Sequence, residues 1–483
     1  MSDTYKKDIQ EERRKFKICC VFDEWKCSAS HEDRAFVGMK IRGGMPEIYF
    51  PMGYSQEGKK IYDDPEKFDS EMKDDFYCLV RILSDEALPS YFAKDEMQKC
   101  KLDFPLHAFW GVIRYYQNHG YFYETDVIYK KGGPGKINWS KTIKNIRPDV
   151  AKNGNGQYSV FYLNLVARKN FYRENNLITE IHKFCIYEAV RLVGVFLGIS
   201  VNDIEPSIYN NDLENIPDYD FFIDVVREKM ESTFNDRFID LFSHMLQVLK
   251  FLSNKQVEGD EDSQYMFGVE GFAHVWEMMV DRIFGTLSSK EINECNPHLQ
   301  FVLDSKDDLG ESRRSTLRPD TIMICDVENG RPGCFVLDSK FYKFGLYSDD
   351  KKERIKYLPG ADSTCKQMAY AEYIKEKKGI SFFSKIKSNS IYNAFIMPYC
   401  AAIKKNGKLE KNKRKCSNYY GIKSKGYMYG DWKNKWDDKH PYFRIACILL
   451  DVKSVMRDYN PSFKAQNILA KQIISAINPK KGT

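Results

Sequence analysis

The strongest constraint on the fold of this chain is a pair of apolar segments, "TIMICDV" and "CFVLDSKFY", within residues 318–342. Both segments are rich in β-branched and aromatic residues, which favour strands. Between them lies "ENGRPG", a run of turn-forming residues. We therefore predict a β-hairpin in which Asp320 opens the first strand and Asp338 and Lys340 lie on the second.

The charged residues of this hairpin are expected to gather on one face. Side chains alternate along a strand, so Asp338 and Lys340 share a face and Ser339 points the other way. Strand pairing then brings Asp320 close to both. Two carboxylates beside one ammonium favour a bound cation, and Mg²⁺ prefers oxygen ligands and keeps waters. Such a metal stabilises charge on phosphate, and the lysine orients or deprotonates the attacking water. The pattern points to phosphodiester hydrolysis.

Parts of this pattern occur twice more in the chain. "RPD" recurs at 147–149, but the strand that follows carries no acid. "ILLDVK" at 448–453 contains a second D-x-K, but no proline-anchored acid lies on a strand before it. We interpret both copies as structural, with Asp451 and Lys453 available for a salt bridge.

Two segments around the hairpin have helical periodicity. "FGVEGFAHVWEMMVDRIFG" places its apolar residues on one face and four polar residues on the opposite flank. These four are Glu270, His274, Glu277 and Asp281. Glu277 lies nearest the apolar edge, although such a stripe is more often simply solvated. "ADSTCKQMAYAEYIKEKKG" predicts a helix capped by Ser363 or Thr364, in which Gln367 and Tyr370 are neighbours.

The acidic, polar run at 253–264 marks the predicted domain boundary. It separates an α+β region at 1–252 from an α/β domain at 265–483, which has a mixed β-sheet flanked by helices. In the first region we expect a β-rich unit at 16–54, a hairpin around the Gly-rich turn within 120–139, and helices over 214–252.

Charge and composition narrow the class of protein. The 483 residues carry a net charge of +6, but residues 404–439 alone carry twelve Lys or Arg and four acids. This basic insertion is either a solvated loop or a phosphate-contacting arm. Its aromatic residues suit stacking on unpaired bases or attachment to the core.

The sequence also indicates the cellular compartment and argues against nucleotide binding through a Walker A motif. The 13 cysteines are scattered, without a C-x-x-C pair, which indicates reduced thiols. The charged N-terminus resembles no signal peptide, so we expect a cytoplasmic protein without a membrane segment. "GGPGK" fails the Walker A pattern because Ile137 follows Lys136.

The order of these elements resembles the PD-(D/E)xK nuclease superfamily, and "Q-x-x-Y" at 367–370 resembles the helix motif of its RecB-like members. Six segments narrow the resemblance to the LlaJI-type restriction endonucleases, which are akin to the McrC nuclease subunit. These segments are "FVGMKIRGGMPEIYFPMGYS", "GKINWSKTIK", "FAHVWEMMVDRIFG", "RPD", "VLDSKFY" and "YFRIACILLDVKSVM".

The resemblance implies a Mg²⁺-dependent endonuclease acting on double-stranded DNA in bacterial defence, with Mn²⁺ as a substitute metal. It implies a separate AAA+ GTPase motor as partner and DNA methyltransferases encoded nearby. Asp320 and Asp338 would be metal ligands and Lys340 the catalytic lysine. Glu277 would be the helix acid, with Glu270 as the alternative because Ala273 stands where the family often has an acid.

Two further roles and three alternatives remain open. Gln367 and Tyr370 would support the site or contact the DNA backbone, and the first 252 residues would read the target and dock the partner. The chain could instead be a DNA-binding assembly subunit with an inactive core, or a nuclease acting on RNA or on DNA ends.

Overall fold

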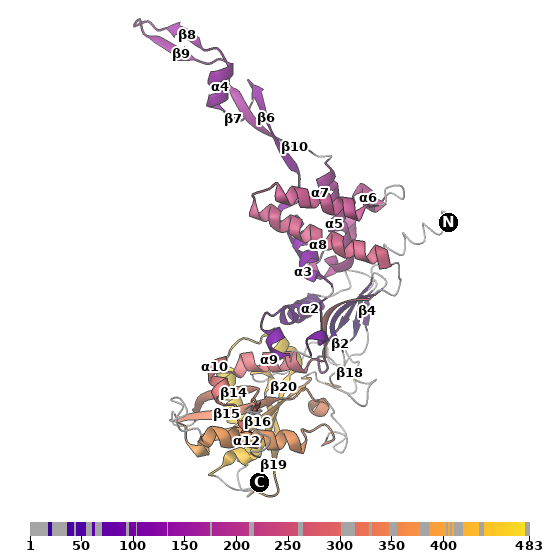
Figure 1. Cartoon of the computed structure of the whole chain (residues 1–483), viewed down its shortest axis with the longest axis vertical. Coiled ribbons are helices and arrows are strands. Elements are labelled where there is room, and N and C mark those ends of the chain that lie inside the picture. Colours follow the sequence, from indigo (N-terminus) through magenta and orange to yellow (C-terminus); the bar gives the residue numbers. More distant parts are fainter. Residues whose placement is uncertain are drawn as a thin grey trace, which may run out of the picture. The chain divides into compact units, whose positions relative to one another are not determined.

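The protein is described by a computed structural model. The described residues are 18–21, 36–42, 45–54, 60–62, 70–92, 96–102, 104–132, 134–173, 176–211, 217–258, 264–300, 314–327, 331–346, 355–376, 386–401, 404–405, 408–409, 419–433 and 439–478. They fall into two compact units. A helical unit comprises residues 104–258, and a sheet unit combines 18–102 with 264–478 (Figure 1).

The first sheet of the sheet unit joins strands from residues 18–102 with one strand from the middle of the chain. Its strand order is β4 (Lys60–Tyr62), β1 (Ile18–Val21), β3 (Met45–Tyr49), β2 (Phe36–Arg42), β11 (Gln264–Glu270) and β5 (Cys100–Leu102). β2 and β11 approach closely at a glycine pair. A Cβ atom on Gly38 would lie 2.2 Å from the carbonyl oxygen of Phe267, so only glycine fits there.

The second sheet forms the predicted C-terminal core. Its order is β14 (Thr321–Val327), β15 (Arg331–Ser339), β16 (Ile391–Tyr399), β20 (Arg444–Asp451) and β19 (Lys423–Tyr429). The two outer pairs are antiparallel, whereas β15–β16 and β16–β20 are parallel. The helices associated with it are α9 (Ala273–Phe284), α12 (Ala361–Glu376), α13 (Val452–Arg457) and α14 (Phe463–Ile477). This mixed sheet with flanking helices confirms the predicted fold class.

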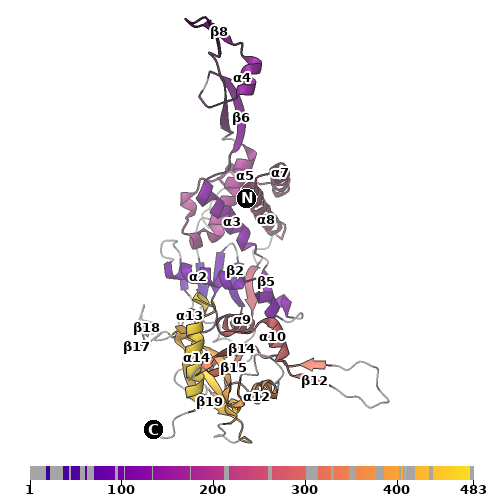
Figure 2. The same ribbon diagram turned by 90° about the vertical axis from the view of Figure 1, so that its left-hand side faces the viewer.

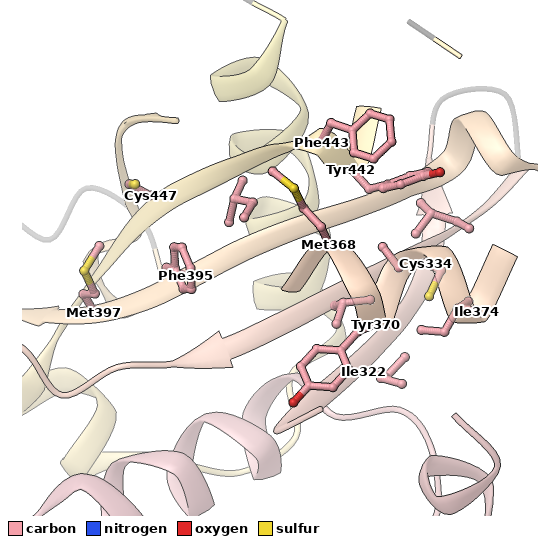
Figure 3. Packing of buried hydrophobic residues seen from close by; sticks show 14 of the residues in the cluster. Ile322, Cys334, Met368, Tyr370, Ile374, Phe395, Met397, Tyr442, Phe443 and Cys447 are labelled. Carbon is pink, nitrogen blue, oxygen red and sulfur yellow. The ribbon is translucent and has the colours of Figure 1, made fainter. Parts of the chain in front are cut away.

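Alternating side chains give this sheet two buried faces. One face packs against α12, where Met368, Tyr370 and Ile374 lie beside Ile322 and Cys334 (Figure 3). The other face is buried as well, and α9 and α14 pack against the sheet. Parallel strands buried on both faces are typical of α/β proteins.

The remaining elements of the sheet unit are shorter. They are α2 (Ser70–Leu83), η4 (Leu88–Tyr91), η5 (Met97–Lys99), α10 (Ser289–Glu294), β12 (His298–Gln300), β13 (Arg314–Thr316), η8 (Lys343–Gly345), η10 (Ser388–Ser390), β17 (Lys404–Lys405), β18 (Lys408–Leu409), η11 (Tyr419–Gly421) and η12 (Pro441–Phe443). α2 packs against both β2 and α13.

The helical unit consists of a helix bundle and an arm. The bundle contains α3 (Leu106–His119), α5 (Leu177–Val193), η6 (Gly194–Leu197), η7 (Val201–Asp203), α6 (Ile208–Asn211), α7 (Tyr219–Glu231) and α8 (Asp236–Glu258). The arm contains β6 (Glu124–Lys131), β7 (Lys136–Ile137), α4 (Trp139–Asn145), β8 (Asp149–Lys152), β9 (Tyr158–Phe161) and β10 (Val166–Arg173). Within this unit the arm extends away from the bundle (Figure 1 and Figure 2).

Three details differ from the sequence-based expectations. The hairpin expected within 120–139 is wrong, because β6 and β7 do not pair with each other but flank β10 on either side. The helix carrying Glu277 begins only at Ala273, because Glu270 belongs to β11 and Gly271 has a φ of +84°. Ser363 and Thr364 lie inside α12 rather than at its cap.

The compact units also do not coincide with the expected division at 253–264. β11 pairs with β2, which brings residues 18–102 into the unit of the C-terminal sheet. α8 extends to Glu258, into the expected linker. Among the described residues, no helix is long and apolar enough to cross a membrane.

Only part of the basic insertion at 404–439 is described. Residues 406–407, 410–418 and 434–438 lie outside the described residues. Tyr420 is buried, which matches attachment to the core, whereas Tyr419 and Trp432 are exposed. β19 forms the edge of the second sheet, so this part of the insertion belongs to the α/β core.

Candidate active site

The predicted hairpin at 318–340 is present as the antiparallel pair β14–β15. The first register pair is Thr321 with Leu337, so Asp320 stands opposite Asp338 where the hairpin ends. The backbone N–H of Ser339 donates a hydrogen bond of 2.8 Å to the Oδ2 atom of Asp320. Strand pairing therefore brings the two predicted acids together.

The two carboxyl groups share one ammonium group. Nζ of Lys340 lies 2.8 Å from Oδ1 of Asp338, and the Asp338 residue is 7% exposed. Burial raises the pKa of Asp320 well above its usual range, and the charges of Asp338 and Glu277 raise it further. The Lys340 ammonium opposes this effect without cancelling it. Ionising Asp320 in this site is therefore unfavourable without a further positive charge.

Lys340 is a charged group at neutral pH. Burial alone would lower the pKa of its ammonium, but the carboxylates of Asp338 and Asp320 raise that pKa above the usual value. In this arrangement the side chain donates hydrogen bonds and supplies positive charge. Of the two roles predicted for the lysine, the charge state favours orienting a water or phosphate oxygen over accepting a proton.

α9 brings Glu277 to the end of the hairpin. The apolar side of α9 is buried, and Nε1 of Trp276 donates to the carbonyl oxygen of Ile396 at 3.3 Å. The same carbonyl accepts a hydrogen bond from the backbone N–H of Lys340 at 2.9 Å. The charge of Glu277 raises the pKa values of Asp320 and Tyr370, so Glu277 lies near the site.

Glu270, the alternative helix acid, lies elsewhere. It is the last residue of β11 and stands opposite Phe36 in the first sheet. Its charge is not among the causes that shift the pKa of Asp320. The structure therefore brings Glu277, rather than Glu270, to the two aspartates.

Gln367 and Tyr370 of α12 are both buried. The hydroxyl of Tyr370 donates to the carbonyl oxygen of Arg318 at 2.9 Å, two residues before Asp320. Burial raises the pKa of Tyr370 to about 12, and the nearby aspartates contribute. The amide of Gln367 lies 3.5 Å from the carbonyl oxygen of Ala394. These positions fit support of the site better than contact with a DNA backbone.

Sequence reasoning missed Tyr91 as a neighbour of this site. Its hydroxyl donates to Oδ2 of Asp281 on α9 at 2.8 Å. Burial raises the pKa of Asp281, and the charge of Glu277 adds to the effect. Tyr91 lies about 190 residues before α9 in the sequence, so no local pattern indicates this contact.

The two other copies of the motif have different surroundings. Asp149 begins β8, whose residues are all exposed. Asp451 caps α13 by accepting hydrogen bonds from the backbone and hydroxyl of Ser454, at 3.0 and 2.6 Å. Lys453 forms an ion pair with Asp75 at 2.6 Å. Both residues of this copy thus make structural contacts, and the expected Asp451–Lys453 salt bridge stays a prediction.

The donor set suits a hard divalent cation. Mg²⁺ commonly binds through one or two protein carboxylates, with waters and substrate phosphate completing its shell. Asp320 and Asp338 offer two such groups, and a bound cation would offset the cost of ionising the buried Asp320 carboxyl. Among the residues that the structure describes, no group of three or more His, Cys, Asp or Glu side chains is arranged to hold a metal. Among the described residues, the expected Mg²⁺ binding therefore depends on the two carboxylates of Asp320 and Asp338.

Comparisons with known proteins bear on the class of this site. A family model described as "LlaJI restriction endonuclease" matches residues 90–409. The chain belongs to this family. The match includes the β14–β15 hairpin, α9 and α12, so the LlaJI family assignment covers every residue of the candidate site.

Two individual proteins are similar to this LlaJI-family chain. "Type II restriction enzyme BsuMI component YdjA" of Bacillus subtilis (strain 168) is 27% identical over 289 residues. The alignment covers 58% of this chain and 55% of that protein, so it spans about half of the relative's length. A solved assembly of Thermococcus gammatolerans McrB AAA+ hexamers with bound McrC aligns at 12% identity and a TM-score of 0.31, covering 91% of this chain and 82% of the other. That score is too low for a structural argument.

Proposed function

We propose that this chain is the Mg²⁺-dependent DNA endonuclease subunit of a bacterial restriction system. The observation that best supports the proposal is the hairpin geometry, in which Asp320, Asp338 and Lys340 converge at the end of the second sheet. Membership of the LlaJI restriction endonuclease family supports the reaction class.

Each residue of the site has a separate role in this proposal. Asp320 and Asp338 would hold Mg²⁺, or Mn²⁺ in its place, and Glu277 is the third acid near that position. The metal would supply an activated water and would stabilise charge on the scissile phosphate. Lys340, held by Asp338, would orient the water or a phosphate oxygen. Tyr370 would fix the chain segment just before Asp320.

A cleavage assay tests the proposal. The purified chain, with its partner GTPase and GTP, is incubated with circular duplex DNA, linear duplex DNA or RNA in Mg²⁺ or Mn²⁺. We expect cutting of circular duplex DNA by the wild type and none by Lys340→Ala. Cutting confined to DNA ends or RNA would change the substrate class. DNA binding without cutting under all these conditions would indicate an assembly subunit with an inactive core.

We also propose that the arm docks the separate AAA+ GTPase. Residues 124–173 contain ten Lys or Arg and three acids, and they expose a series of large apolar side chains. These side chains are Val127, Tyr129, Ile137, Trp139, Ile143, Val150, Tyr158, Val160, Phe161 and Leu163. Exposed apolar groups of this extent favour a protein partner over solvent.

The β8–β9 hairpin offers a matched test of docking. Val150 and Val160 are paired across the strands and are 60% and 62% exposed. Replacing both by Thr keeps the β-branched shape but removes apolar contact, and we expect about tenfold weaker partner binding. The control replaces Ala151 and Ser159, the next pair on the opposite face, by Thr. Equal affinities for the two variants would remove this face from the interface.

A further inference from the structure

Residues 88–92 and 96–99 contact α9 at two places. The hydroxyl of Tyr91 donates to Asp281 at 2.8 Å. The Nε2 atom of His274, also on α9, lies 3.1 Å from Oε2 of Glu96. His274 and Asp281 are seven residues apart, so they share one face of the helix, and Glu277 lies between them. Both contacts therefore flank Glu277, the helix acid near the site.

The imidazole of His274 is held on several sides. Its ring lies 4.7 Å from the ring of Phe92, at an interplanar angle of 54°. Its Nδ1 atom lies 3.9 Å from Oε2 of Glu277, while Nε2 faces Glu96. Glu96 is itself fixed by Lys99, whose Nζ lies 2.5 Å from Oε1. The imidazole thus lies between the carboxylates of Glu96 and Glu277.

This connection suggests a role beyond packing. We propose that His274 is a positioning residue that aims Glu277 at the Asp320–Asp338 pair, with Glu96 fixing its ring orientation; this inference rests on the proposed nuclease function. Residues that orient groups around a metal in this way change metal affinity or activity by about 10- to 100-fold when they are removed. The His274–Glu96 contact also makes the geometry of Glu277 depend on a segment some 180 residues away in sequence.

The test measures Mn²⁺ binding by calorimetry with the full chain, and cutting of duplex DNA in the presence of the partner. The variants are His274→Ala, His274→Gln and Glu96→Gln. We expect His274→Ala to weaken Mn²⁺ binding about tenfold and to lower kcat with an unchanged KM for DNA. His274→Gln keeps a hydrogen-bonding side chain and should restore part of both. Glu96→Gln should show an intermediate loss.

Arg282→Ala is the matched control. Arg282 lies on the same helix and also ties it to an N-terminal residue, because its guanidinium lies 2.5 Å from Oδ1 of Asp85. This variant should lower thermal stability without changing Mn²⁺ affinity. Equal Mn²⁺ affinities for wild type and His274→Ala, or a wild type that binds no Mn²⁺, would overturn the proposal. An effect of His274 on Mn²⁺ binding without any DNA cutting would keep the positioning role and reject the nuclease function.

Discussion

The backbone N–H of Ser339 donates a hydrogen bond of 2.8 Å to the carboxylate of Asp320. This bond spans the two strands of the hairpin and fixes Asp320 beside Asp338. The carboxylate is held there although burial and two neighbouring acids raise its pKa. The protein therefore keeps an electrostatically unfavourable group in place, which is typical of functional sites.

The first prediction concerns Asp320→Asn. An acid whose pKa is raised in the folded state lowers the free energy of unfolding once the pH exceeds about 4, the pKa of the same group in the unfolded chain. The cost grows as the pH rises towards neutrality. Asn retains an oxygen that can accept the Ser339 N–H. We expect this variant to be more stable than the wild type without metal, by about 1 kcal/mol at pH 7, or a few degrees in Tm.

Thermal denaturation with and without Mg²⁺ checks this prediction. Mg²⁺ should raise the Tm of the wild type through binding to the folded state, and the variant should lose both this shift and DNA cutting. The stability difference between the two proteins should vanish at pH 4. A metal-free variant that melts below the wild type at pH 7 would contradict the argument.

The second prediction concerns the Asp338–Lys340 ion pair. Lys340→Met leaves two carboxylates without their cation, and we expect a loss of about 1–2 kcal/mol in the metal-free chain. The pKa of Lys340 is raised in the folded chain. Its stabilising effect is therefore complete below about pH 10.4, the pKa of a lysine in the unfolded chain, and declines only above that pH. The loss should therefore be constant between pH 7 and pH 9.

The double variant Asp338→Asn/Lys340→Met should recover stability but not cutting, as a double-mutant cycle by urea denaturation would show.

The third prediction separates support of the site from contact with DNA. Tyr370→Phe removes the hydrogen bond to the carbonyl oxygen of Arg318, which should cost about 1 kcal/mol. We expect cutting to slow several-fold while the Kd for DNA stays unchanged, because the side chain is buried. Fluorescence anisotropy with labelled duplex DNA measures the Kd. A weaker Kd with normal stability would instead assign Tyr370 to DNA binding.

The predictable part of the structure is the part encoded locally. The hairpin follows from alternating side chains around one turn, so Asp320, Asp338 and Lys340 can be placed from residues 318–340 alone. Helical periodicity likewise places Glu277 on a polar flank. It does not distinguish Glu277 from Glu270, because the strand that ends at Glu270 is defined by pairing with Phe36, more than 230 residues away.

Contacts between residues far apart in the sequence also explain the other differences between the predicted and the observed structure. β6 and β7 are neighbours in sequence, yet β10 lies between them and provides the pairing that both require. Tyr91 reaches Asp281, and Lys453 reaches Asp75, through contacts that close loops of about 190 and 380 residues. Such contacts depend on the assembled fold, so the periodicity of a single segment does not predict them.

The last prediction tests how residues 70–85 are attached to the α/β core. Asp75 of α2 is fully buried and forms ion pairs with Lys453 at 2.6 Å and with Arg457 at 2.9 Å. Asp75→Ala leaves the Lys453 charge buried without this partner, and removing one member of a buried ion pair costs about 3–5 kcal/mol. We expect a large fall in Tm and in the urea midpoint of the sheet unit. Glu376→Ala removes an exposed contact with Lys375 and should cost under about 0.5 kcal/mol. Equal losses for the two variants would show that the Asp75 cluster contributes no more to attachment than a surface pair.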